Sequence, residues 1–136
     1  MEMKTLTVII EQTENNYSAY VQEVDGLIAT GGSVDEIKRG IVESINVLIE
    51  ECKENGDVIP DELQGEYNLV FKMDVQSMLG FYTGIFTKAG LERITGINQK
   101  QLWHYASGKR KPRPEQTVKI ESALHKLGEE LISINL

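Results

Sequence analysis

The sequence predicts an α+β fold, with a βββαβ module in residues 1–74 and an all-helical domain in residues 75–136. Before Asp74, several short segments alternate apolar and polar residues with a period of two, which is typical of half-buried strands. They surround one long segment of helical periodicity. After Asp74, apolar residues recur mainly at steps of three and four, which indicates helices. The 136 residues suffice for one ordinary domain or two very small ones.

Three strands open the first module. In "TLTVIIEQ", Leu6, Val8 and Ile10 alternate with other residues, and "ENN" then supplies a turn. "YSAYVQEV" continues with residues of high β propensity as far as the "DG" turn. "LIAT" follows and runs into Gly31 and Gly32. The segment therefore predicts a three-stranded meander.

A long helix and a fourth strand complete the module. Ser33 and Glu36 have capping-box spacing at the start of "SVDEIKRGIVESINVLIEECKENG", and Gly56 suits its end. The apolar face of this helix consists of Val34, Ile37, Ile41, Ile45, Leu48 and Cys52. In "EYNLVFKMD" the alternating residues are Tyr67, Leu69, Phe71 and Met73, which predicts a strand that joins the sheet.

Four helices are expected after Asp74. The segment "VQSMLGFYTGIF" predicts a helix over 75–86, although two glycines interrupt it. A short helix, "TKAGLERIT", begins after Thr87 and ends at Gly96. The next, "NQKQLWHYAS", has Asn98 as N-cap, Gln101 at the capping-box position and Gly108 as terminator.

The last helix begins at Pro114, which suits a first helical turn. Its apolar side consists of Ile120, Ala123, Leu124, Leu127 and Leu131. The tail "LISINL" alternates and predicts either a strand or a dimer contact. Because each half is small, its isolated core should be marginal, and we expect a homodimer or higher homo-oligomer formed through the C-terminal half.

Charge is divided unequally between the two halves. The chain has a net charge of −7, but residues 1–86 carry five basic and sixteen acidic residues, a net charge of −11. The remaining fifty residues carry nine basic and five acidic residues, a net charge of +4. A basic region suits a polyanion, whereas an acidic region attracts a cationic protein. The two halves should therefore bind different partners.

The two short helices joined by "TGIN" have the length and turn chemistry of a helix-turn-helix. Ile97, Leu102 and Tyr105 should point inward against Leu91 and Ile94. The outward residues of the second helix are then Gln99, Lys100, Gln101, Trp103 and His104. Gln pairs with adenine edges and Lys with guanine acceptors, so this set suits base reading. Trp103 should either stack on the DNA backbone or pack partly against the last helix.

A cationic loop follows the second helix and should contact phosphates. Its basic residues are Lys109, Arg110, Lys111 and Arg113. Lys88, at the start of the first helix of the pair, is either a phosphate contact or an ordinary solvated lysine. The competing interpretation of the whole region is a small helical subdomain with a solvated basic loop.

Several other classes of function find little support. One cysteine, Cys52, excludes an internal disulfide and a CxxC pair. Apolar runs near the start are too short for a secretory segment or a membrane span, so we expect a cytoplasmic protein without membrane contact. We expect no cofactor, no metal site and no catalysis. A metal-dependent nuclease stays an alternative, with Glu11, Asp25 and Glu43 as candidate ligands.

Both halves resemble known families. The stretch "TKAGLERITGINQKQLWHYASGKRKP" resembles helix-turn-helix domains of the lambda-repressor-like class. The stretch "YSAYVQEVDGLIATGGSVDEIKRGIVESI" resembles the HicB antitoxin module, with a Tyr-rich strand, a Gly-bounded third strand and a capped helix. HicB antitoxins often carry such a DNA-binding domain behind a partial ribonuclease-H-like fold. The combination covers nearly the whole chain.

The resemblance implies an antitoxin of a type II toxin-antitoxin system. Its N-terminal module would neutralise a HicA-like mRNA-cleaving toxin, which should be basic, and its C-terminal domain would bind operator DNA and repress its own operon. A stand-alone helix-turn-helix transcriptional regulator is the alternative. Two positions depart from the family pattern. Glu92 stands where a small residue usually faces the recognition helix, and Ile37 stands where alanine is common.

Overall fold

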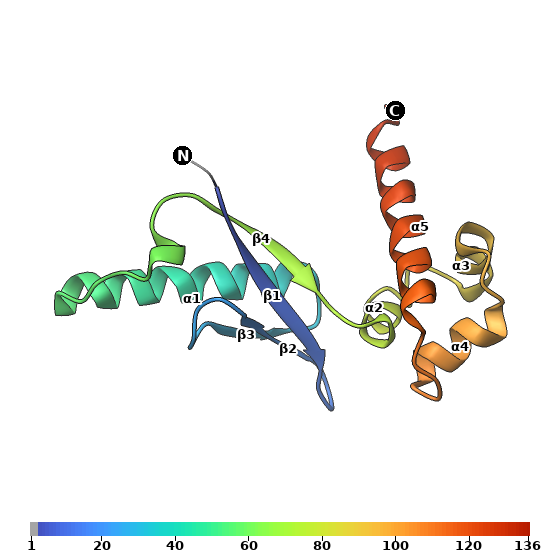
Figure 1. Ribbon diagram of the computed structural model, residues 1–136, viewed down its shortest axis with the longest axis horizontal. Coiled ribbons are helices and arrows are strands. Elements are labelled where there is room, and N and C mark those ends of the chain that lie inside the picture. The colour runs from blue at the N-terminus through green and yellow to red at the C-terminus, as the bar shows by residue number, and fades with distance from the viewer. Residues whose placement is uncertain (1–2) are drawn as a thin grey trace. The chain divides into compact units, whose positions relative to one another are not determined.

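The structure is a computed structural model that describes residues 3–136. The chain divides into two compact units between Asp74 and Val75. In the described residues the fold is α+β, with a four-stranded mixed sheet and five α-helices (Figure 1). The α+β class expected from the sequence is therefore confirmed.

The first unit contains all the strands. They are β1 (Lys4–Gln12), β2 (Tyr17–Val21), β3 (Ile28–Gly31) and β4 (Tyr67–Lys72), arranged in the order β3-β2-β1-β4. The helix α1 (Val34–Asn55) and a short 3-10 helix η1 (Asp61–Leu63) connect β3 to β4. β1 pairs antiparallel with β2 and parallel with β4, and β2 pairs antiparallel with β3. The expected βββαβ order is present, and β4 joins the sheet beside β1.

One face of the sheet is buried against α1. Leu6, Val8 and Ile10 of β1 are buried, as the alternation predicted. The matching face of α1 buries Ile37, Ile41, Ile45 and Cys52, and α1 packs against β2 and β3 (Figure 1). The alternation predicted for β4 is also present, with Leu69 and Phe71 half-buried between exposed neighbours.

The ends of α1 are set by local chemistry. The Ser33 Oγ accepts a hydrogen bond from the Glu36 N–H at 3.2 Å, and the Glu36 carboxylate accepts one from the Gly32 N–H at 2.7 Å. At the other end Gly56 adopts a left-handed conformation with φ 72°, and its N–H donates to the Cys52 carbonyl. These contacts satisfy backbone groups that the helix itself leaves unpaired.

Close contact between α1 and β3 depends on a glycine. A Cβ atom at Gly40 would lie 2.9 Å from the Ala29 Cβ, which is too close for two carbon atoms. The absence of a side chain at Gly40 therefore lets the helix approach the sheet. Neither residue stood out in the sequence, because the pair forms only when α1 crosses β3.

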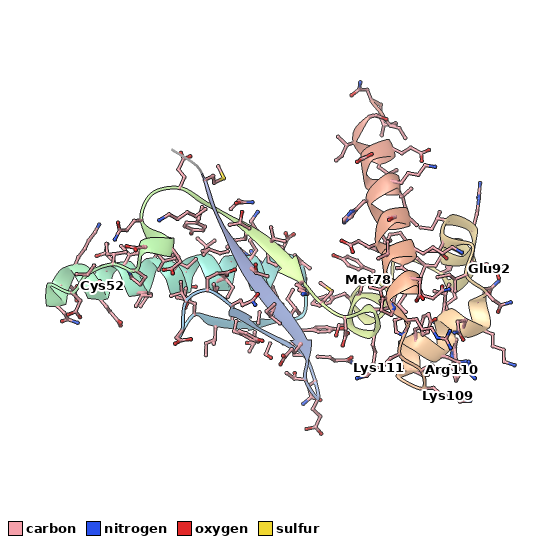
Figure 2. The ribbon with its side chains drawn as sticks, viewed as in Figure 1. Cys52, Met78, Glu92, Lys109, Arg110 and Lys111 are labelled. Carbon is pink, nitrogen blue, oxygen red and sulfur yellow. The ribbon has the colours of Figure 1, made fainter. Side chains whose placement is uncertain are left out.

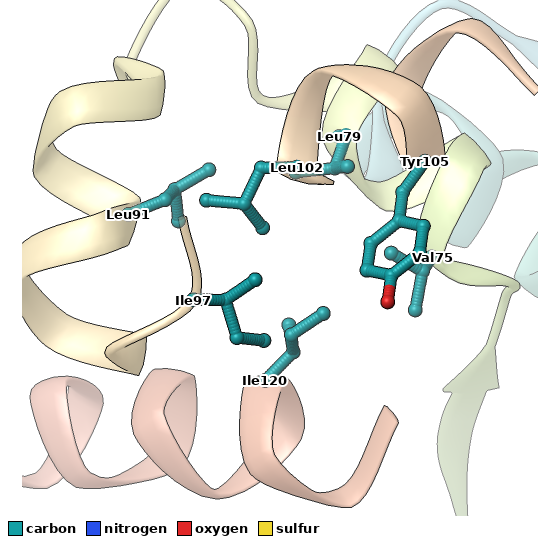
Figure 3. Packing of buried hydrophobic residues seen from close by; sticks show 7 residues of the cluster. All are labelled: Val75, Leu79, Leu91, Ile97, Leu102, Tyr105 and Ile120. Atoms are coloured by element: carbon teal, nitrogen blue, oxygen red, sulfur yellow. The ribbon is translucent and has the colours of Figure 1, made fainter. Parts of the chain in front are cut away.

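The second unit contains four helices. They are α2 (Val75–Phe81), α3 (Lys88–Thr95), α4 (Gln99–Ser107) and α5 (Pro114–Ile132). Seven buried residues form its core, around the fully buried Leu102 (Figure 3). The other six are Val75, Leu79, Leu91, Ile97, Tyr105 and Ile120. Residues from all four helices and from the turn between α3 and α4 meet in this cluster.

Two sequence predictions for this unit are wrong in detail. The helix predicted over 75–86 ends at Phe81, because a separate turn follows in which the Ile85 and Phe86 N–H groups both donate to the Tyr82 carbonyl. Of the two alternatives for the tail, the strand is wrong, because α5 continues as far as Ile132 and has Ser133 as its C-cap. Hydrogen bonds from the Ser133 N–H to carbonyls of the last turn favour continued helix over an extended chain. The dimer contact stays a prediction.

Candidate nucleic-acid interface

The α3–α4 pair is held by caps at both ends of each helix. The Thr87 Oγ1 accepts from the Gly90 N–H at 2.9 Å, and the Asn98 Oδ1 accepts from the Lys100 N–H at 2.8 Å. Gly96 and Gly108 end the two helices in left-handed conformations, with φ 74° and 79°. The predicted N-caps and terminators are therefore confirmed.

The turn between the two helices is fixed by Thr95, which the sequence analysis did not single out. Its hydroxyl donates to the Leu91 carbonyl at 2.6 Å and accepts from the Ile97 N–H at 3.1 Å. Thr95 and Ile97 are both buried. Because the turn is bonded to α3 and anchored in the core, the start of α4 has a defined direction.

The inward side of α4 is as predicted. Leu102 and Tyr105 are buried, together with Leu91 from α3 (Figure 3). On the outer side, Gln99, Lys100 and Trp103 are exposed, and Trp103 keeps 54% of its surface accessible. These three side chains are therefore accessible to a partner.

Gln101 and His104 are only half-buried, so they are less available than the sequence indicated. The Gln101 Nε2 donates to the Tyr105 hydroxyl at 3.0 Å instead of completing a capping box, so the capping-box prediction is wrong here. The bond is favoured because residues four apart lie on the same helix face. It ties the Gln101 side chain to the buried Tyr105.

His104 lies between Trp103 and the basic loop. The two rings meet edge to face, with centroids 5.9 Å apart. The His104 Nδ1 is inaccessible to solvent and has no hydrogen-bond partner among residues 3–136. Desolvation lowers the pKa of His104, and the charges of Lys109, Arg110 and Lys100 lower it further. His104 should therefore be uncharged at neutral pH.

The basic loop begins directly after Gly108. Figure 2 shows Lys109, Arg110 and Lys111 together on this loop, and all three are exposed. The Arg110 N–H donates to the His104 carbonyl at 3.2 Å, which folds the loop back on the end of α4. Arg113, also exposed, is the N-cap residue of α5. The fold thus presents four exposed cations on the segment that follows the C-terminal end of α4.

Glu92 takes part in the α3–α4 contact. Its Oε1 accepts from the Gln99 backbone N–H and its Oε2 from the Gln99 Nε2, both at 3.2 Å. Glu92 therefore bridges the two helices by hydrogen bonds. Its carboxylate accepts from a first-turn amide of α4 that has no partner within the helix, so this larger side chain adds hydrogen bonds between the two helices.

Two lysines outside α4 occupy different environments. Lys88 is half-buried and lines a hollow of about 200 Å³, together with residues of α2, the following turn and Ala106. Lys119 of α5 lies over the turn, with its Nζ 3.7 Å from the position of a Cβ on Gly96. Sequence reasoning missed Lys119, because its place depends on how α5 packs against α3.

The chain matches none of the family models, curated proteins or solved structures with which it was compared. Residues 3–136 contain no group of three or more His, Cys, Asp or Glu residues suited to hold a metal ion. Within the same residues no helix is long and apolar enough to span a membrane. The functional interpretation therefore rests on the geometry of the two units.

Proposed function

We propose that this protein is a DNA-binding antitoxin of the HicB type that also represses its own operon. In this proposal α3 and α4 act as a helix-turn-helix, and the sheet unit acts as a partial ribonuclease-H-like module that neutralises a basic, HicA-like toxin in the cytoplasm. The observation that carries the proposal is the outer face of α4, where exposed Gln99 and Lys100 lie on the helix that the basic loop follows.

The DNA part of the proposal is supported by the division of polar groups on this surface. Gln99 and Lys100 stand in the first turn of α4, which is the part of a recognition helix that meets base edges. The four cations of residues 109–113 follow the opposite end of the helix and are suited to phosphates. Base-reading and phosphate-binding groups therefore occupy separate positions.

A homodimer would place two copies of the outer face of α4 about a twofold axis. The end of α5 and the tail expose several apolar side chains, of which Ile132 keeps 85% of its surface accessible. The others are Leu131, Ile134 and Leu136. Covering them with a second copy would remove apolar area from water. Two α4 helices would then read half-sites about 34 Å apart on a palindromic operator.

The toxin part of the proposal is supported by the charge and the open face of the sheet unit. The pairing registers place Ile28, Tyr20 and Ile9 side by side on the face away from Leu6 and Val8. Ile28 is exposed over 68% of its surface, so this apolar row is not covered. An acidic unit with an exposed apolar row suits a cationic protein partner.

A mobility-shift experiment on the promoter of its own operon tests the DNA part. We expect the full-length protein to shift this duplex at concentrations at which a shuffled duplex of equal length stays unbound. Equal binding to both duplexes would contradict a role as an operator-specific repressor.

Co-purification with proteins encoded by neighbouring reading frames tests the toxin part. We expect a small basic protein to co-purify with the full chain, and residues 1–74 to be the part that it protects from proteolysis. Specific operator binding without such a partner would instead favour the stand-alone transcriptional regulator.

A further inference from the structure

The contact between Glu92 and Gln99 joins the middle of α3 to the first residue of α4. One oxygen of the Glu92 carboxylate accepts from the Gln99 main chain and the other from its side chain, both at 3.2 Å. Gln99 is exposed on the outer surface of α4. The same carboxylate therefore fixes both the helix start and the side chain that lies nearest to it.

The chemistry of the contact determines which way the Gln99 amide faces. A carboxylate only accepts hydrogen bonds, so the NH2 end of the Gln99 amide has to face Glu92. The Gln99 carbonyl oxygen is then the group presented outward, together with the second N–H of the amide. A free glutamine side chain, in contrast, rotates and presents either end.

In the major groove this orientation has a consequence for base recognition. An outward carbonyl oxygen accepts from an exocyclic amino group, which adenine carries at N6 and cytosine at N4. Guanine and thymine present oxygen acceptors at the corresponding positions. The remaining Gln99 N–H can donate to these acceptors, but the Gln99 carbonyl oxygen then meets no donor. The orientation of this amide thus favours bases that offer an amino donor to the Gln99 oxygen.

We propose that Glu92 is a specificity-determining positioning residue, which holds the Gln99 amide so that it selects a base with an exocyclic amino group. The inference rests on the proposed DNA-binding function. Glu92 itself does not touch DNA in this scheme, and it acts only through Gln99.

A purely structural role for Glu92 leads to a different expectation. A negative charge at the first turn of α4 also stabilises that helix through the helix dipole. If this were its whole contribution, removing the charge would weaken binding to all sequences alike. The base preference at the position contacted by Gln99 separates the two roles.

The test is selection of bound duplexes from a randomised pool, with full-length wild type, Glu92→Gln, Gln99→Ala and the double variant. Gln at position 92 keeps the size of the side chain but both donates and accepts, so the Gln99 amide is free to reverse. We expect wild type to prefer adenine or cytosine at one position of each half-site, and Glu92→Gln to reduce this preference about tenfold. Preferences elsewhere in the site should persist.

The double variant tests whether Glu92 acts through Gln99, and a second variant controls for the loss of one negative charge. We expect Gln99→Ala to abolish the same preference, and the double variant to lose no more than Gln99→Ala alone, because Glu92 acts through Gln99. Glu129→Gln removes an equal charge from an exposed position of α5 and should leave all preferences unchanged. Thermal unfolding of each variant shows whether it is folded.

Specific binding with an unchanged base preference in folded Glu92→Gln would overturn this inference and leave the proposed function intact. Additive losses from Glu92→Gln and Gln99→Ala would overturn it as well. If wild type selected no sequence at all, the proposed repressor function would fail, and the inference with it.

Discussion

The sheet unit and the helical unit are held together in different ways. In the sheet unit, backbone pairing between distant strands and the buried isoleucines of α1 provide the framework, and the surface is strongly acidic. In the helical unit, local caps define each helix of the α3–α4 pair, and seven buried side chains form the core. Because α4 buries only Leu102 and Tyr105 in this small core, its exposed residues Gln99, Lys100, Trp103 and Ser107 stay accessible for recognition.

The largest expected effect concerns the charge difference between the units. Replacing Lys109, Arg110, Lys111 and Arg113 together by Gln removes the four phosphate contacts that we propose. We expect operator affinity at moderate salt to fall by about a hundredfold or more, and the salt slope to decrease by about three to four units. Mobility shifts over a series of salt concentrations provide the measurement.

The matched control replaces four exposed cations of the sheet unit by Gln. They are Lys38, Arg39, Lys53 and Lys72. DNA affinity should stay the same, because these charges belong to the unit that is not expected to bind DNA. A comparable loss in this control would show that charge placement does not distinguish the two units.

The next effect tests whether the two units unfold separately. Gly40→Ala introduces a Cβ only 2.9 Å from the Ala29 Cβ, and we expect overpacking to lower the free energy of unfolding by about 1–3 kcal/mol. On α5, a Cβ at Gly128 would have no atom within 4 Å. Gly128→Ala should therefore raise the free energy of unfolding by about 0.5–1 kcal/mol.

Urea unfolding followed by two probes measures both changes. The single tryptophan, Trp103, reports on the helical unit, whereas far-UV circular dichroism reports on the whole chain. Gly40→Ala should leave the Trp103 transition in place. If that transition moved equally, the two units would unfold together and the comparison between them would need revision.

A smaller effect separates base reading from phosphate binding within the helical unit. Lys100→Ala should change the base preference at one position by about tenfold. Lys109→Ala should weaken binding to all sequences similarly and decrease the salt slope by about one unit. Indistinguishable results for the two variants would contradict the division of this surface into reading and phosphate-binding residues.

The smallest expected effect is a pH dependence from His104. Because its pKa is lowered in the folded state, the unfolded chain binds more protons as the pH falls through about 6.5. The contribution of His104 to stability is therefore complete above that pH and is lost on acidification. We expect His104→Gln to reduce the stability loss between about pH 7.5 and about pH 5.5. Melting followed by Trp103 fluorescence measures this, with exposed His125→Gln as the control.

Local features of the fold were predictable because they depend on residues close together in the chain. The Ser33, Thr87 and Asn98 caps, the Gly56, Gly96 and Gly108 terminators and the buried face of β1 all follow from side-chain type and spacing. The end of α2 was placed too late, because its periodicity continues through residues that fold into a separate turn.

The sequence by itself determined where the helices of the α3–α4 pair begin and end, which side of α4 is apolar, and how charge is divided between the two halves. Only the tertiary structure decided that β4 pairs with β1, that Gly40 meets Ala29, and that Glu92 binds Gln99. The physical reason is distance along the chain. Caps and periodicity act within one or two helical turns, whereas these contacts form only after separate elements have packed together.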